Sequence, residues 1–236
     1  MNIYLMDKKI KKILQCPNCS SEKFIDKVNS YECKVCKSSY KYGKDQLDLR
    51  LPKEKVVNIP FAIGGDFVID HSFAPLEINE YSKLNFDFKN VPAHLTKELL
   101  SHFPKGDGVT ALALDLGCGK GVHKDVIKTA GYTYVGFDYE SPSADILGDA
   151  HSLPFCDNSF DFVLSMAVLE HIKFPFIYSN EIYRVLKPNG TLIGSVAFLE
   201  GFHSHSYYHH THYGTYNTLE SAGFNNITVA PNPHWH

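Results

Sequence analysis

Residues 112–121 read Leu-Ala-Leu-Asp-Leu-Gly-Cys-Gly-Lys-Gly, and this stretch decides the fold. An apolar run typical of a buried strand leads directly into three glycines at alternate positions. Glycine allows a backbone to turn tightly and to approach a ligand closely, because no side chain intervenes. The spacing differs from the dinucleotide fingerprint G-x-G-x-x-G, since position 122 is a valine. The stretch therefore predicts a strand, a ligand-binding glycine loop and the start of a helix.

The apolar pattern after residue 91 alternates between strand and helix types. Such alternation is typical of crossover units that build a parallel sheet. Strands are expected at Ala111–Leu116, Tyr134–Phe137, Ala144–Leu147, Phe160–Met166, Thr191–Phe198 and Asn226–Ala230. Helices are expected at Pro92–His102, Val122–Ala130, Phe176–Leu186 and Gly214–Ser221. Two prolines in residues 231–236 exclude an interior strand there, so we expect a sheet of six strands.

Three acidic residues accompany successive strands of this predicted sheet. Asp115 lies in the first strand, Asp138 follows the second, and Asp149 follows the short third strand. Ligands of open α/β sheets bind at the carboxyl ends of the strands. A carboxylate at Asp138 can accept hydrogen bonds from both hydroxyls of a ribose, and one at Asp149 can accept from an adenine amino group. The acids favour a nucleoside-containing ligand.

Over residues 91–230 the chain resembles the class I S-adenosylmethionine-dependent methyltransferases, in particular a broad subgroup that acts on small molecules. The resemblance runs through Asp115–Gly121, Asp138, Gly148–Phe155, Phe160–Ser165, Val168–His171 and Glu181–Gly190. It implies an α/β fold with a mainly parallel, Rossmann-like methyltransferase sheet and helices on both faces. The usual last, antiparallel strand of this class is missing from the expected strands, so the chain departs from the family pattern.

The resemblance also implies S-adenosylmethionine as the cofactor and assigns roles at the matching positions. The expected cofactor-binding residues are Gly117, Gly119 and Gly121 around the methionine part, Asp115 near its amino group, Asp138 at the ribose, Asp149 and Ala150 at the adenine, and Ser165 and Met166 beside the transferred methyl group.

Four cysteines form two C-x-x-C pairs, Cys16 with Cys19 and Cys33 with Cys36, separated by 13 residues. Two such turns can complete a tetrahedron of thiolates around one ion, and this ligand set favours zinc or an iron centre. We expect a structural Zn²⁺ in a ribbon that folds independently of the glycine-loop region. The spacing resembles zinc ribbons that are fused to, or activate, some methyltransferases.

Charge is divided unevenly along the chain. Residues 1–55 hold 13 Lys and Arg against 7 Asp and Glu, a formal +6, whereas residues 56–236 carry 10 against 19, a formal −9. The basic part is either a solvated lysine-rich surface or a docking face for an acidic partner or RNA. With no apolar run long enough for a membrane span and no signal peptide pattern, we expect a cytoplasmic protein.

Methyl transfer requires a general base only if the acceptor must lose a proton, and histidine is then the natural choice. His171 follows the fourth expected strand and either borders the cleft or caps a helix locally. His209 and His210 belong to a histidine-rich stretch after the fifth strand. This stretch is interpreted as a cap over the cleft, a plain loop or, less favourably, a metal site.

The sequence predicts a zinc ribbon at residues 1–50, a connector packed on the body at 51–90, and a methyltransferase domain at 91–236 that lacks the last strand. The expected activity is methyl transfer to a small molecule. Two alternatives remain open: a zinc-ribbon rRNA guanine methyltransferase, and a non-catalytic cofactor-binding scaffold for a partner.

Overall fold

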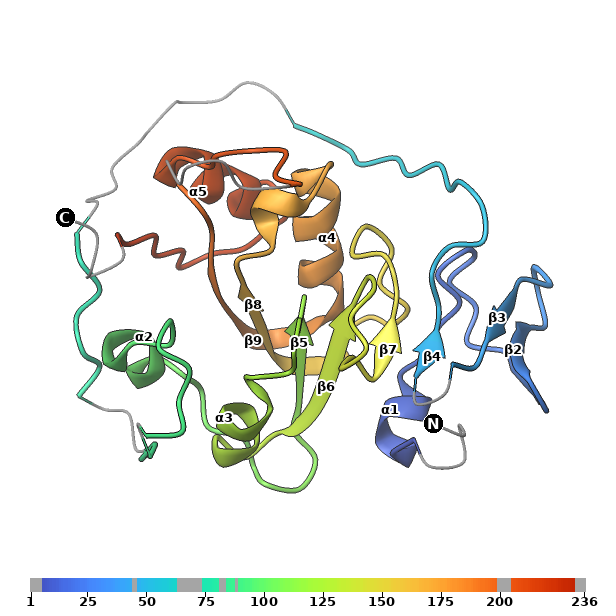
Figure 1. Ribbon diagram of the computed structural model, residues 1–236. Helices are drawn as coiled ribbons and strands as arrows, with labels where there is room; N and C mark the ends of the chain where they lie inside the picture. The colour runs from blue at the N-terminus through green and yellow to red at the C-terminus, as the bar shows by residue number, and fades with distance from the viewer. Residues whose placement is uncertain are drawn as a thin grey trace.

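The computed structural model describes residues 6–43, 46–62, 74–80, 84–87, 89–198 and 205–231 (Figure 1). No helix within these ranges is long and apolar enough to cross a lipid bilayer. The chain forms a large parallel sheet with a smaller antiparallel sheet beside its edge.

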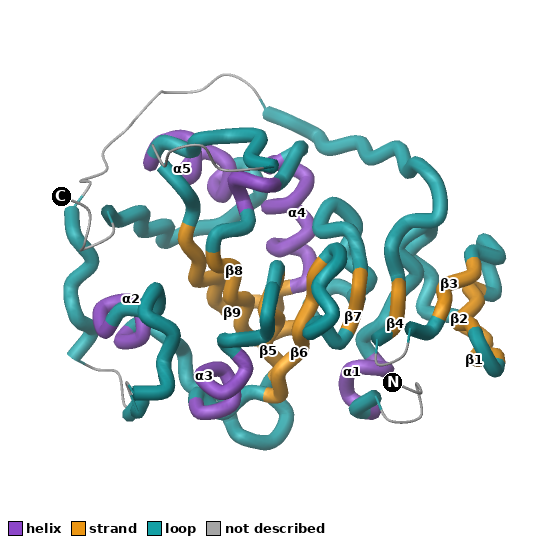
Figure 2. The backbone as a smooth tube through the Cα atoms, in the orientation of Figure 1, coloured by secondary structure: helices purple, strands orange, loops and turns teal. Residues whose placement is uncertain are grey.

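The central sheet has six strands in the order β4-β7-β6-β5-β8-β9, and every neighbouring pair is parallel (Figure 2). The strands are β4 (Leu47–Asp48), β5 (Leu112–Leu116), β6 (Thr133–Asp138), β7 (Ile146–Leu147), β8 (Phe160–Met166) and β9 (Leu186–Ser195). β5 is buried along its whole length, as expected for a central strand covered on both faces.

Successive side chains of each strand point to opposite faces of the sheet, so both faces carry apolar side chains, and helices cover both. The helices are α1 (Lys8–Lys12), α2 (Lys97–Ser101), α3 (Lys124–Thr129), η2 (Leu169–His171), α4 (Pro175–Val185) and α5 (His212–Glu220). Leu112 and Leu114 join one apolar cluster with Ile182 of α4, whereas Ala113 joins a second cluster with Val126 of α3. The predicted α/β fold with helices on both faces is confirmed.

An N-terminal lobe, residues 6–43 and 46–49, carries the small sheet of β1 (Phe24–Lys27), β2 (Ser30–Cys33) and β3 (Ser39–Lys41). It shares one apolar cluster with the central sheet. Members from the lobe include Leu14, Cys16 and Tyr40, and members from the body include Ile146 and Phe155. This shared core favours joint folding of lobe and body over the independent ribbon expected from the sequence.

The sixth strand of the sheet is not the one that the sequence predicts. Residues 226–230 form no strand, and Asn226 has a φ of 53°, which interrupts an extended backbone. The lobe supplies the sixth strand as β4, which pairs with β7 in parallel. Of the proline-rich end, residues 232–236 lie outside the described residues, so the absence of a seventh strand there stays a prediction.

Candidate functional site

The glycine loop connects β5 to α3 at the carboxyl end of the sheet (Figure 1). Its three glycines have positive φ angles. At Gly117, with a φ of 75°, an added Cβ would lie 2.3 Å from Cγ2 of Val168, so only glycine fits. At Gly119 an added Cβ would meet no atom within 4 Å. The loop therefore presents open space at Gly119, with no side chain in it.

Asp138, at the end of β6, holds this loop. Its Oδ2 accepts a hydrogen bond from the Gly119 N–H at 3.0 Å, and its Oδ1 accepts from the N–H groups of Glu140 and Ser141, each at 3.1 Å. The Ser141 hydroxyl donates back to the Gly119 carbonyl. The predicted ribose acid and the predicted glycine loop thus lie in direct contact.

Asp115 is fully buried and its carboxylate has two partners. Nδ1 of His123 lies 2.9 Å from Oδ1, and the Tyr134 hydroxyl donates to Oδ2 at 3.0 Å. Nε2 of His123 in turn lies 2.7 Å from Nε2 of His94. Burial, and then the neighbouring His123, lower the pKa of His94. His123, Tyr134 and His94 were not predicted, because no spacing in the sequence shows which side chains converge on or near a buried carboxylate.

Asp149 follows β7 and is held by the neighbouring His151. Oδ1 of Asp149 accepts a hydrogen bond from the His151 N–H at 2.9 Å and lies 2.7 Å from Nδ1 of the ring. Although burial opposes ionisation, these contacts keep the pKa of Asp149 below its usual value. Ala150, between them, packs partly buried against the larger apolar cluster.

Ser165 and Met166 end β8 and are both buried. The Ser165 hydroxyl forms a hydrogen bond with the hydroxyl of Tyr178 on α4. Burial raises the pKa of Tyr178, so the pair is neutral at physiological pH.

The three candidate histidines differ in their surroundings. Nδ1 of His171 lies 3.2 Å from the carbonyl oxygen of His205, whereas His209 is exposed. His210 is buried, and burial lowers its pKa despite a hydrogen bond with the Leu169 backbone. The histidine-rich stretch therefore lies over the residues that follow β8.

The four cysteines converge in the N-terminal lobe. Their sulfur atoms all lie within 4.8 Å of one another. The two turns match: Ser20 N–H donates to the Cys16 carbonyl at 2.7 Å, and Lys37 N–H donates to the Cys33 carbonyl at 3.1 Å. Two equivalent turns that present four sulfurs to one point fit a tetrahedral ion, which is compatible with a zinc ribbon.

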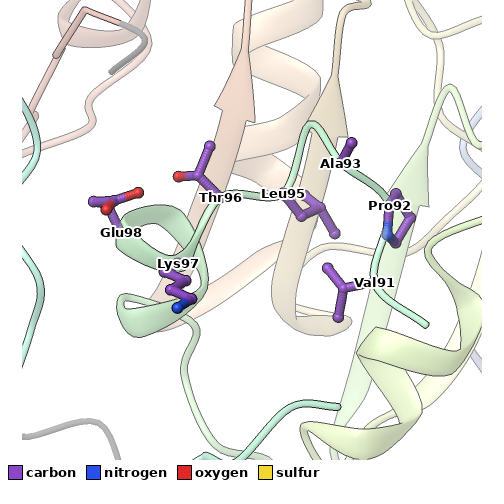
Figure 3. A pocket seen from close by; sticks show the side chains of 7 residues that line it. All are labelled: Val91, Pro92, Ala93, Leu95, Thr96, Lys97 and Glu98. Atoms are coloured by element: carbon purple, nitrogen blue, oxygen red, sulfur yellow. The ribbon is translucent and has the colours of Figure 1, made fainter. Parts of the chain in front are cut away.

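A pocket of about 310 Å³ lies before and within the start of α2, and Figure 3 shows the side chains that line it. None of the predicted site residues lines it. The lining residues are Val91, Pro92, Ala93, Leu95, Thr96, Lys97 and Glu98. His94, which contacts His123 after the glycine loop, belongs to the same segment.

A parallel sheet with a glycine loop after β5 and carboxylates after β6 and β7 defines a Rossmann-like methyltransferase fold. In agreement, residues 114–194 match the family described as "Methyltransferase domain". The stretch that runs from β5 into β9 is therefore similar to this family.

Individual relatives match about a third of the chain. A protein of Mycolicibacterium smegmatis, named a probable S-adenosylmethionine-dependent methyltransferase, is 32% identical over 93 residues, 35% of this chain and 36% of its own. A mitochondrial arginine hydroxylase of Rattus norvegicus is 31% identical over 97 residues, 36% of this chain and 28% of its own. The chain thus spans about a third of the length of these curated relatives.

Among solved structures, one chain of a complex between the Trm112 methyltransferase activator and a methyltransferase from Haloferax volcanii is 28% identical to this chain. The match covers 55% of this chain and 67% of the other, with a TM-score of 0.46.

Proposed function

We propose that the chain is an S-adenosylmethionine-dependent methyltransferase that acts on a small molecule. One observation carries the proposal: the open space at Gly119 lies beside the carboxylate of Asp138. Within the described residues, Oδ2 of Asp138 accepts one hydrogen bond, and a carboxylate oxygen can accept two. Asp138 therefore retains the capacity to bind a ribose hydroxyl next to a loop that leaves room for the rest of the ligand.

The other predicted residues fit the same ligand. Both contacts of Asp149 with His151 use Oδ1, so Oδ2 serves the adenine amino group. Ser165 and Met166 lie at the carboxyl end of β8, where the resemblance expects the transferred methyl group. The cofactor, when bound, supplies a methyl group that its sulfonium already activates. The residues of this chain then position the acceptor in line and exclude water.

We also propose that Cys16, Cys19, Cys33 and Cys36 bind one structural Zn²⁺. Four sulfurs within 4.8 Å of one another would repel as thiolates unless a cation joined them, and soft sulfur ligands favour zinc. Free thiols also fit a reducing compartment, in line with a cytoplasmic location. Native mass spectrometry should find one zinc per chain, and a folded, metal-free protein would contradict the assignment.

A small acceptor is favoured over RNA because residues 56–236 carry a formal charge of −9, which opposes a phosphate-rich substrate in the cleft. The basic residues 1–55 support RNA docking as the second candidate. Methyl-labelled S-adenosylmethionine should be incubated with a small-molecule extract and, separately, with total RNA. Label in the small-molecule fraction is expected; label in RNA would favour the second candidate.

Label in neither fraction would favour a scaffold or a different reaction. A different reaction is a relevant outcome, because one relative is named a hydroxylase and not a methyltransferase.

A further inference from the structure

Glu170, in η2 directly after β8, is the most deeply buried acidic side chain without a partner. It is 0% exposed, and neither carboxylate oxygen has a hydrogen-bond partner within the described residues. Asp115 is buried to the same degree, yet both of its oxygens are hydrogen-bonded. A buried charge without a partner costs free energy, and proteins retain such groups mainly at functional sites.

Two further unpartnered atoms lie in the segment that covers Glu170. This cover segment, residues 205–210, is attached through backbone bonds: Tyr207 N–H donates to the Glu170 carbonyl at 2.7 Å. His210 makes a hydrogen bond with the Leu169 backbone. Nε2 of His210 and the hydroxyl of Ser206 are buried without partners. Unpaired polar atoms therefore belong to both segments of one backbone contact, that between η2 and the cover segment.

Glu170 follows closely after the predicted site residue Met166 at the end of β8, with three residues between the two. Its negative charge adds to burial in raising the pKa of Tyr178, which bonds to Ser165. Glu170 is thus near the hydroxyl pair that ends β8.

The missing partner of Glu170 should carry positive charge. Within the described residues no Lys, Arg or His forms an ion pair with this carboxylate. The rings of Tyr207 and Tyr208 in the cover segment are 58% and 43% exposed. Aromatic faces attract organic cations, and a carboxylate pairs with them. The combination is typical of a site for an amine.

We propose that Glu170 binds the amine nitrogen of the methyl acceptor and accepts its proton. This assignment rests on the proposed function. The neutral nitrogen forms the bond to the methyl carbon while the carbon–sulfur bond breaks, with its electron pair left on sulfur. The proton that the bound ammonium loses before the attack passes to Glu170 and then to solvent, and the methylated nitrogen takes on the positive charge that the sulfonium gives up. Because Glu170 is covered in this structure, the cover segment must shift to admit the amine.

Glu170→Gln is the decisive variant, and Glu181→Gln is the matched control. Glu181 also has a shielded carboxylate, but it bonds to Arg184 at 2.8 Å and to the Leu153 N–H at 2.6 Å. We expect Glu181→Gln to lower the midpoint of thermal unfolding. We expect Glu170→Gln to leave it unchanged or raise it by a few degrees, because an unpaired charge is removed. A lower midpoint for Glu170→Gln would show a structural role and overturn the proposal.

Ligand binding gives two further measurements. Affinity for S-adenosylhomocysteine should stay within about twofold of wild type in Glu170→Gln, whereas methyl transfer to the amines of a small-molecule extract should fall about 100-fold or more. Retained transfer would overturn the proposal.

A probe amine separates this proposal from the proposed function. With S-adenosylhomocysteine present, ethylammonium chloride should raise the unfolding midpoint of wild type above that in sodium chloride, and should not do so in Glu170→Gln. This measurement tests the amine site even if the wild-type protein transfers label to no fraction of the extract. Absence of label would count against methyl transfer itself. Equal stabilisation of both proteins, or of neither, would overturn the amine site.

Discussion

Asp138→Ala should weaken both the fold of the glycine loop and the binding of S-adenosylhomocysteine. The variant removes three hydrogen bonds, at 3.0, 3.1 and 3.1 Å, from backbone N–H groups to one carboxylate. Asp138 is only half-buried, so solvent replaces part of each bond and the expected loss of stability is about 1–2 kcal/mol in total. For a chain of this size that loss lowers the unfolding midpoint by roughly 2–8 °C.

The effect on binding should be larger than the effect on folding. Hydrogen bonds from ribose hydroxyls to a charged group contribute about 1.5–3 kcal/mol each. Since 1.4 kcal/mol corresponds to about tenfold in affinity, loss of a single such bond predicts at least tenfold weaker binding. Isothermal titration calorimetry with S-adenosylhomocysteine measures this directly, at a temperature where urea denaturation shows the variant to be folded.

Asp145→Ala is the control for loss of a carboxylate near the same strand. Oδ2 of Asp145 accepts a hydrogen bond at 2.8 Å from the Gly136 N–H of β6 and not from a residue of the glycine loop. This variant should lose stability and keep its affinity for S-adenosylhomocysteine. If both variants lose affinity equally, the effect runs through folding and the ribose site is placed wrongly.

Three other predictions follow from single features. Gly117→Ala should lose about 2–4 kcal/mol in urea denaturation, from a positive φ and the 2.3 Å approach to Val168, and Val168→Ala in the same chain should recover part of it. Chelation of the metal should lower the unfolding temperature of the whole chain in one calorimetric transition, reversed by zinc; a separate early transition of the lobe would argue against the shared core. Asp149→Asn should lose stability relative to wild type above about pH 4, and the difference should vanish as pH falls through the lowered pKa of Asp149, because a depressed carboxylate stabilises only while ionised. A difference that persists in acid would contradict the role of its contacts with His151.

The central strands could be predicted because local pattern and burial agree. β8 is Phe160–Met166 in both the prediction and the structure, since most of its residues are apolar and six of the seven are buried, as in a strand covered on both faces. Helix ends were less predictable: the helix expected from Pro92 begins only at Lys97, because a turn closed by the Leu95 N–H and the Pro92 carbonyl precedes it. Thr96 caps the helix that remains.

β4 could not be predicted, since its two residues have no periodicity and its partner β7 lies about 100 residues further along the chain. The residues of the candidate site likewise include some that the sequence predicts and some that it does not. The glycine loop and its acids were visible because glycine and carboxylate each have a specific local task. Glu170 could not be singled out, because its distinguishing feature is a buried carboxylate without a hydrogen-bond partner, and a sequence does not show which partners a carboxylate has.

The N-terminal lobe contacts the very segment that supports the predicted ribose site. Gln46 donates to the carbonyls of Ser141 and Ala144 at 2.6 and 2.9 Å, while the Ser141 N–H donates to Asp138. The lobe also supplies β4, which pairs with β7. Without β4, the edge of β7 would expose unpaired backbone groups. We expect a change at Gln46 to reach Asp138 through the hydrogen bonds of Ser141, and a change in the cysteine cluster to reach the body through the shared apolar core. On this argument the lobe is predicted to support the ribose site, and not only to bind metal.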